Sequence, residues 1–64
     1  MFVLLTEATT GEYILLRKSL IDRAYPDVHI VNGKQTTVTR IDFVDNKPTE
    51  WVEESVTDIY KKLL

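Results

Sequence analysis

The chain has 64 residues, no cysteine, one histidine and a net charge of −2. This length confines it to one small domain, and the composition excludes disulfides, thiolate metal sites and zinc sites built from several histidines. The negative charge argues against broad binding to phosphate backbones, and the ordinary apolar content of 44% argues against disorder. The opening MFVLLTEATTGE has no basic segment and only a short apolar run, so we expect neither a signal peptide nor a membrane span. The absence of cysteine favours a cytoplasmic protein.

Two strands are predicted at the start, over Phe2–Ala8 and Glu12–Lys18, joined by a turn in which Gly11 can adopt a positive φ. Placing Ala8 opposite Gly11 gives the cross-strand pairs Val3–Leu16, Leu4–Leu15, Leu5–Ile14 and Thr6–Tyr13. Both faces of this hairpin are then largely apolar. A half-buried antiparallel pair would instead alternate apolar and polar residues.

The next stretch, SLIDRAYP, indicates a single helical or 3₁₀ turn rather than a longer helix. Ser19 can cap such a turn, with Asp22 in the position of the second capping-box residue. Pro26 should end the turn, and Tyr25 is expected to be extended because it precedes proline.

Asn32-Gly33, between two extended segments, is typical of a type I′ hairpin turn. With Val31 opposite Lys34, residues that alternate along both strands share one face. The side chains predicted to point inward are Val28, Ile30, Ile41 and Phe43.

A further turn is predicted at DNKP, residues 45–48, where Pro48 fits a strand start. Pairing Val44 with Thr49 sets Ile41 opposite Val52, Arg40 opposite Glu53 and Asp42 opposite Trp51. Opposite charges across the strands would favour this register by a few tenths to about 1 kcal/mol.

The C-terminal SVTDIYKKLL predicts a helix capped by Ser55, with Asp58 three residues later. Its apolar stripe consists of Val56, Ile59, Tyr60 and Leu63. Residues 1–64 are therefore predicted to form a single α+β domain. It would contain a small antiparallel sheet of about five strands, strongly curled or barrel-like, and a C-terminal α-helix.

One short helix covers only one face of the sheet, so one apolar face of the first hairpin is left over. The two alternative sets are Val3, Leu5, Ile14 and Leu16, or Phe2, Leu4, Tyr13 and Leu15. Barrel closure, a second copy of the chain or a different protein could cover it. We expect a homo-oligomer, with a dimer favoured, because small cores are often completed in this way.

Glutamates near the C-terminus invite a metal or acid–base interpretation. In a strand, however, Glu50 and Glu54 point to one face and Glu53 to the other, so the three carboxylates do not converge. His29 is predicted to face solvent, and no second histidine is present. We therefore expect no catalytic residue, no metal and no cofactor, and a protein that is not an enzyme.

Trp51 is predicted to face away from the core, on the same side as Asp42. Two interpretations stay open: an aromatic side chain that covers a twisted sheet, or an anchor in an interface, where tryptophan is enriched. Aromatic and basic side chains of this outer face would also suit a nucleic-acid-associated regulatory domain, which is the alternative function. The candidate interface residues are Phe2, Leu4, Tyr13, Leu15, Arg40 and Trp51.

The segments MFVLLTEATTGEYI and WVEESVTDIYKKLL resemble FlbD-type small bacterial proteins and similar chains of phage and mobile elements. Those proteins begin with a short M-apolar-x-L-T strand and a Gly-containing turn, and end in V-x-E-S and an amphipathic helix. The middle departs from this pattern, with DNKP before the last strand and an extra hairpin around Asn32-Gly33. The resemblance implies a β-rich domain with a C-terminal helix and transfers no catalytic residue. We expect a non-enzymatic interaction or accessory protein, encoded by a phage or mobile element.

Overall fold

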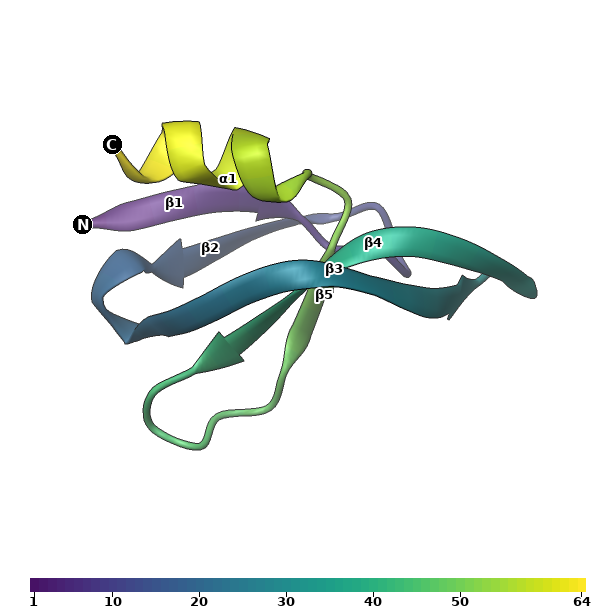
Figure 1. Cartoon of the computed structure of the whole chain (residues 1–64), viewed down its shortest axis with the longest axis horizontal. Helices are drawn as coiled ribbons and strands as arrows, with labels where there is room; N and C mark the ends of the chain where they lie inside the picture. The colour runs from purple at the N-terminus through teal and green to yellow at the C-terminus, as the bar shows by residue number, and fades with distance from the viewer.

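The computed structural model describes all 64 residues and has five antiparallel strands in two sheets, with one α-helix at the C-terminus (Figure 1). The strands are β1 (Phe2–Thr6), β2 (Tyr13–Arg17), β3 (Ile21–Val31), β4 (Lys34–Phe43) and β5 (Glu50–Val52), and the helices are η1 (Lys18–Leu20) and α1 (Val56–Leu63). One sheet is the β1–β2 hairpin, and the other has the order β3-β4-β5. The predicted α+β class is confirmed, but the two sheets do not close into a continuous barrel.

The β1–β2 hairpin has the predicted register, with Val3 opposite Leu16 and Leu5 opposite Ile14. Gly11 has a φ of 75°, which a residue with a side chain rarely adopts. The turn residue that the sequence singled out therefore sets the register of the first sheet.

The turn predicted between β2 and β3 is present only as the three-residue 3₁₀ segment η1. The prediction that Pro26 ends it is wrong, because Pro26 lies within β3, opposite Thr39. β3 pairs only with β4 and is an edge strand, where a residue without an N–H can face away from the ladder. Ser19 also makes no capping hydrogen bond.

The hairpin of β3 and β4 turns at Asn32 and Gly33, whose φ angles of 52° and 78° match the predicted type I′ turn. Its register is also as predicted, with Val31 opposite Lys34. Val28 and Ile30, however, are 58% and 56% exposed, so their predicted inward position is wrong. The end of the hairpin projects beyond α1 and β5 (Figure 1), and none of the buried core residues lies on it.

Strand β5 lies two residues away from its predicted register. Val52 is opposite Thr39, and Trp51 is opposite Arg40, so the predicted pairing of Arg40 with Glu53 is wrong. The connection spans residues 44–49 rather than 45–48, and Asn46 within it has a φ of 61°. A shift of two residues preserves the face on which each side chain lies, so Val52 still enters the core.

The core lies between the two sheets and beneath α1. Its central cluster consists of the buried residues Val3, Leu5, Ile41, Val52 and Ile59. The predicted cap is confirmed, because the Asp58 N–H donates a hydrogen bond to Ser55 Oγ at 3.1 Å. Of the predicted apolar stripe, Ile59 and Leu63 pack inward, whereas Val56 and Tyr60 stay exposed.

Two backbone hydrogen bonds join the sheets where β1 meets β5. The Glu53 N–H donates to the Thr6 carbonyl at 2.9 Å, and the Ala8 N–H donates to the Trp51 carbonyl at 2.8 Å. The strands of both sheets thereby follow one another across a single curved surface. The inner face of this surface meets α1, and its outer face remains open.

Candidate interaction surfaces

The outer face of the β1–β2 hairpin carries large apolar side chains that no other part of the chain covers. They are Phe2 (52% exposed), Leu4 (49%), Tyr13 (74%) and Leu15 (62%), which we call the hairpin face. The alternating residues Val3 and Leu5 are buried, so the core uses the other of the two sets left open by the sequence. The four residues of the hairpin face were all predicted as interface residues, and the structure brings them together.

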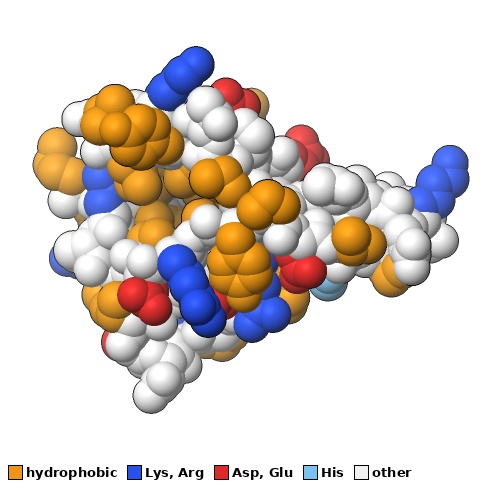
Figure 2. Space-filling model, in the orientation of Figure 1, with side chains coloured by type: hydrophobic (Ala, Val, Ile, Leu, Met, Phe, Trp, Pro, Cys, Tyr) orange, Lys and Arg blue, Asp and Glu red, His pale blue; other side chains and the backbone are white.

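Other apolar side chains are exposed elsewhere on the molecule. In the view of Figure 2 they gather where α1 and β1 lie, and again along the projecting β3–β4 hairpin. On the projecting hairpin, Val28 and Ile30 lie opposite the polar residues Thr37 and Gln35. On the hairpin face of β1 and β2, by contrast, the apolar residues are contiguous across two paired strands.

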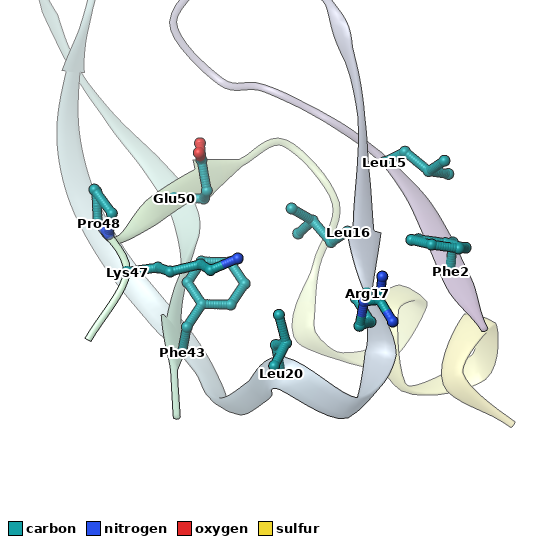
Figure 3. Close-up of a pocket in the computed structure, with 9 residues that line it drawn as sticks. All are labelled: Phe2, Leu15, Leu16, Arg17, Leu20, Phe43, Lys47, Pro48 and Glu50. Atoms are coloured by element: carbon teal, nitrogen blue, oxygen red, sulfur yellow. The ribbon is translucent and has the colours of Figure 1, made fainter. Parts of the chain in front are cut away.

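A groove of about 370 Å³ runs along β2, between that strand and the β4–β5 connection (Figure 3). Its lining residues are Phe2, Leu15, Leu16, Arg17, Leu20, Phe43, Lys47, Pro48 and Glu50. The Arg17 guanidinium lies 5.2 Å from the centre of the Phe2 ring. Burial, reinforced by the nearby Glu7 carboxylate, raises the pKa of Glu50 above its usual value. The sequence analysis did not identify this groove, because it depends on how the two sheets meet.

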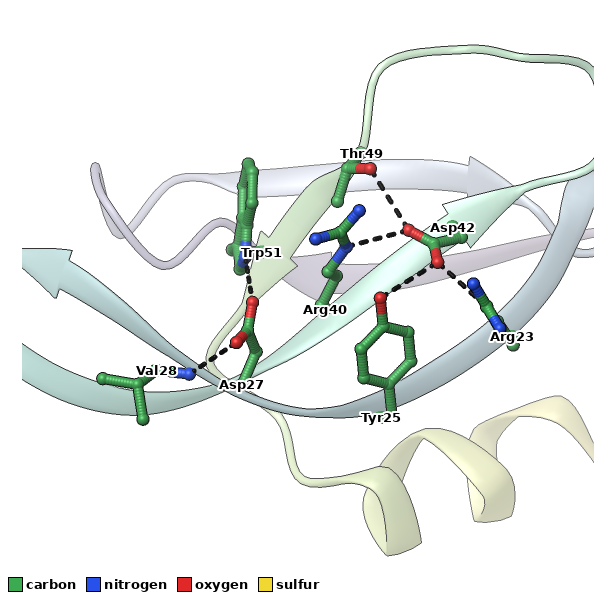
Figure 4. Close-up of polar contacts among 8 residues, drawn as sticks. All are labelled: Arg23, Tyr25, Asp27, Val28, Arg40, Asp42, Thr49 and Trp51. Atoms are coloured by element: carbon green, nitrogen blue, oxygen red, sulfur yellow. Dashed lines mark hydrogen bonds and ion pairs between the residues drawn. The ribbon is translucent and has the colours of Figure 1, made fainter.

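Trp51 lies on the outer face of the three-stranded sheet and is held there by its own chain (Figure 4). Its indole N–H donates to Asp27 Oδ2 at 3.1 Å, and this bond is the main reason that the pKa of Asp27 is lowered. His29 stacks on the indole ring with centroids 4.4 Å apart and planes 10° apart. His29 is thus only partly exposed, and Trp51 lies over the outer face of the twisted sheet.

Asp42 is the centre of a second group of polar contacts on the same face (Figure 4). It accepts hydrogen bonds from Arg40 Nε (3.0 Å), Arg23 Nε (3.0 Å), Tyr25 Oη (3.1 Å) and Thr49 Oγ1 (3.2 Å). These donors, the Arg40 guanidinium first, lower the pKa of Asp42 to about 2. The carboxylate partner of Arg40 is therefore Asp42 on its own strand rather than Glu53.

The arginines of this face also lie over its aromatic rings. Arg23 and Arg40 are 5.4 Å and 5.8 Å from the centre of the Tyr25 ring, and Arg40 is 5.8 Å from that of Trp51. The predicted interface residues Arg40 and Trp51 are therefore neighbours here, in a cluster separate from the hairpin face.

The glutamates near the C-terminus have distinct structural positions. The Glu54 carboxylate accepts hydrogen bonds from the Thr6 N–H at 2.9 Å and from the Thr6 hydroxyl at 2.8 Å, and so ties β1 to the segment before α1. Glu50 lines the groove, and Glu53 is exposed. No three His, Cys, Asp or Glu side chains lie together as metal ligands would.

No protein-family model matches the chain, and comparisons with curated proteins and with solved structures give no match either. The resemblance to FlbD-type chains therefore stays a prediction. None of the helices has the length and apolar character needed to cross a membrane.

Proposed function

We propose that this chain is a small, non-enzymatic protein-interaction or accessory protein that works as a homo-oligomer through the hairpin face. One observation carries the proposal: Phe2, Leu4, Tyr13 and Leu15 form a contiguous apolar surface, each about half exposed or more. Covering apolar surface is favourable by about 25 cal/mol per Å². In this proposal the protein is cytoplasmic, is encoded by a phage or mobile element, and needs no cofactor.

The size of the core supports the same proposal. Only 8 of the 64 residues are buried, so one copy gains little stability from burial, and association is a common way for small domains to add to it. A dimer would bring apolar side chains of two hairpin faces into contact.

Sedimentation across the micromolar range tests the proposal. We expect a dimer, and we expect Leu15→Glu to weaken it roughly thirty-fold or more, because a carboxylate would have to be buried where the two copies meet. Val28→Glu, which places the same charge on the projecting β3–β4 hairpin, is the matched control and should dimerise normally. A wild-type protein that stays monomeric throughout this range contradicts the proposal.

A nucleic-acid-associated regulatory domain is a second candidate, favoured by the grouping of Tyr25, His29 and Trp51 with two arginines on one sheet face. Both arginines are already paired with Asp42, which weakens their attraction for phosphate. A gel-shift titration with single-stranded RNA and DNA at low salt separates the two candidates. The absence of a shift at high micromolar protein would remove the second one.

A further inference from the structure

The backbone of β2 has one paired edge and one free edge. The Glu7 N–H donates to the Glu12 carbonyl at 2.8 Å, and the Lys18 N–H donates to the Met1 carbonyl at 2.9 Å. Hydrogen-bonded and non-hydrogen-bonded residues alternate along an antiparallel pair, and β2 has no second neighbouring strand. The residues whose N–H and C=O groups point away from β1 are therefore Tyr13, Leu15 and Arg17.

The same strand borders the hairpin face and the groove. Leu15 belongs to both, and Figure 3 shows the groove along the side of β2 that faces the β4–β5 connection. The free edge is thus open to another strand, and apolar side chains lie on both of its faces. This combination is what a strand added to a sheet requires: backbone partners along the edge and side-chain contacts above and below it.

We propose that two copies of the chain associate by pairing their β2 strands antiparallel, with Leu15 of one copy opposite Leu15 of the other. This inference rests on the proposed homo-oligomer and specifies its geometry. The two hairpins would form one four-stranded sheet, in which the Leu15 side chains of the two hairpin faces contact each other at a two-fold axis.

The sequence of β2 is complementary to itself in this register. Tyr13 lies opposite Arg17 of the second copy, and the flanking Glu12 lies opposite Lys18, so opposite charges meet at both ends. On the inner face, Ile14 lies opposite Leu16 of the second copy, and Leu16 also lines the groove.

Other registers use the free edge less well. A shift of two residues places Arg17 opposite Gly11, or Tyr13 opposite Ser19, and both of these partners lie outside the strand. A shift of one residue places free backbone groups opposite residues that already bond to β1. Only the register centred on Leu15 pairs all the free residues with one another.

The second free edge in the molecule, on β3, is a poorer site for strand addition. It contains Pro26, which has no N–H, and the charged residues Asp22, Arg23 and Asp27. Proline and charges are the usual means by which edge strands avoid pairing. Between Tyr13 and Leu16, β2 has neither.

A single cysteine tests the proposed contact directly, since the chain has none of its own. Directly opposed residues in a hydrogen-bonded pair have Cα atoms about 5.5 Å apart, within the range that a disulfide spans. We expect Leu15→Cys to form a covalent dimer under mild oxidation, seen on a non-reducing gel. Val28→Cys, equally exposed on the projecting β3–β4 hairpin, is the control for random collision and should stay largely monomeric.

A proline at the same position tests the backbone contribution. Because the Leu15 N–H points away from β1, Leu15→Pro leaves the β1–β2 ladder intact but removes a donor from the free edge. We expect its dissociation constant to exceed that of Leu15→Ala by about tenfold or more. Circular dichroism identifies a misfolded variant, in which case the cysteine experiment alone decides.

The outcomes separate this inference from the proposed function. A wild-type dimer in which Leu15→Cys cross-links no faster than Val28→Cys overturns the β2 pairing and leaves the homo-oligomer standing. A wild-type protein that is monomeric overturns both. Rapid cross-linking of Leu15→Cys but not of Leu4→Cys, which lies on the same face but on β1 away from the free edge, supports both. Equal cross-linking at these two positions overturns the β2 pairing and leaves the homo-oligomer standing.

Discussion

Asp42 shows how much of the outer face depends on one carboxylate. Its donors come from β3, from β4 and from the connection before β5, so a single side chain joins three segments of the sheet. Both arginines, Arg23 and Arg40, are paired with this carboxylate within the chain. Arg40 reaches Asp42 because residues two apart on a strand share a face. The sequence analysis had instead assigned Glu53, on the neighbouring strand, as the partner of Arg40.

Asp42→Asn should destabilise the protein at neutral pH and reduce its sensitivity to acid. The pKa of Asp42 falls from 3.8 to about 2 on folding, so the ionised carboxylate favours the folded state above pH 4. That contribution disappears as the pH falls toward 2. Urea unfolding at pH 7 and at pH 3 measures the effect. The difference between wild type and variant should be larger at pH 7, and an equal difference at both values would rule out this role.

Trp51→Phe isolates the hydrogen bond to Asp27. Phenylalanine keeps a ring for His29 to stack on but leaves the Asp27 carboxylate without the indole donor. We expect a loss of about 1 kcal/mol in the free energy of unfolding. Asp27→Asn in the same background is the control, and it should add little further loss if the two residues act as a pair.

At the scale of elements, the sequence predicted most where turn chemistry is specific. Gly11 and Asn32-Gly33 have positive φ angles, and both hairpins that they close have the predicted register. The connection of residues 44–49 has no such signature, and the register of β5 was wrong by two residues. Pro26 was assigned to a turn because a proline in a strand is disfavoured unless the strand lies at an edge, and edge position is not visible in a sequence.

The same distinction applies to the candidate site. The hairpin face was predicted because alternation within a paired hairpin is local. The contacts of Trp51 with Asp27 and His29 were not predicted, because they depend on the β5 register and join residues more than twenty positions apart. The bond between Thr6 and Glu54 spans 48 positions and likewise has no local signal.

Gly33→Ala tests the turn of the projecting hairpin. A Cβ at this position meets no atom within 4 Å, but the φ of 78° is strained for an L-residue. We expect a loss of about 1 kcal/mol in stability. Chemical synthesis with D-alanine at position 33 is the matched control, because a D-residue favours a positive φ and should retain or increase stability. If both versions destabilise the protein equally, the backbone explanation is wrong.

At the scale of the whole molecule, the inner and outer faces of the curved surface have different roles. The inner face and α1 together form a core cluster of five buried residues. The outer face has a neutralised aromatic cluster over β3, β4 and β5, and an apolar hairpin face with a free edge beside it. The charged groups of the aromatic cluster are paired within the chain, whereas the apolar hairpin face is uncovered and the backbone groups of the β2 edge are free. Association should therefore involve the β1–β2 hairpin.

The thermal stability of the protein should therefore depend on its concentration. Only the folded chain presents the hairpin face, so dimerisation draws the equilibrium toward the folded state by mass action. We expect the unfolding midpoint to rise by roughly a few degrees for each tenfold increase in concentration. Leu15→Glu should strongly reduce this dependence, and Val28→Glu should keep it, as differential scanning fluorimetry or calorimetry would show. A midpoint that does not change with concentration in the wild-type protein would mean that folding of the single chain, with its few buried residues, is sufficient by itself.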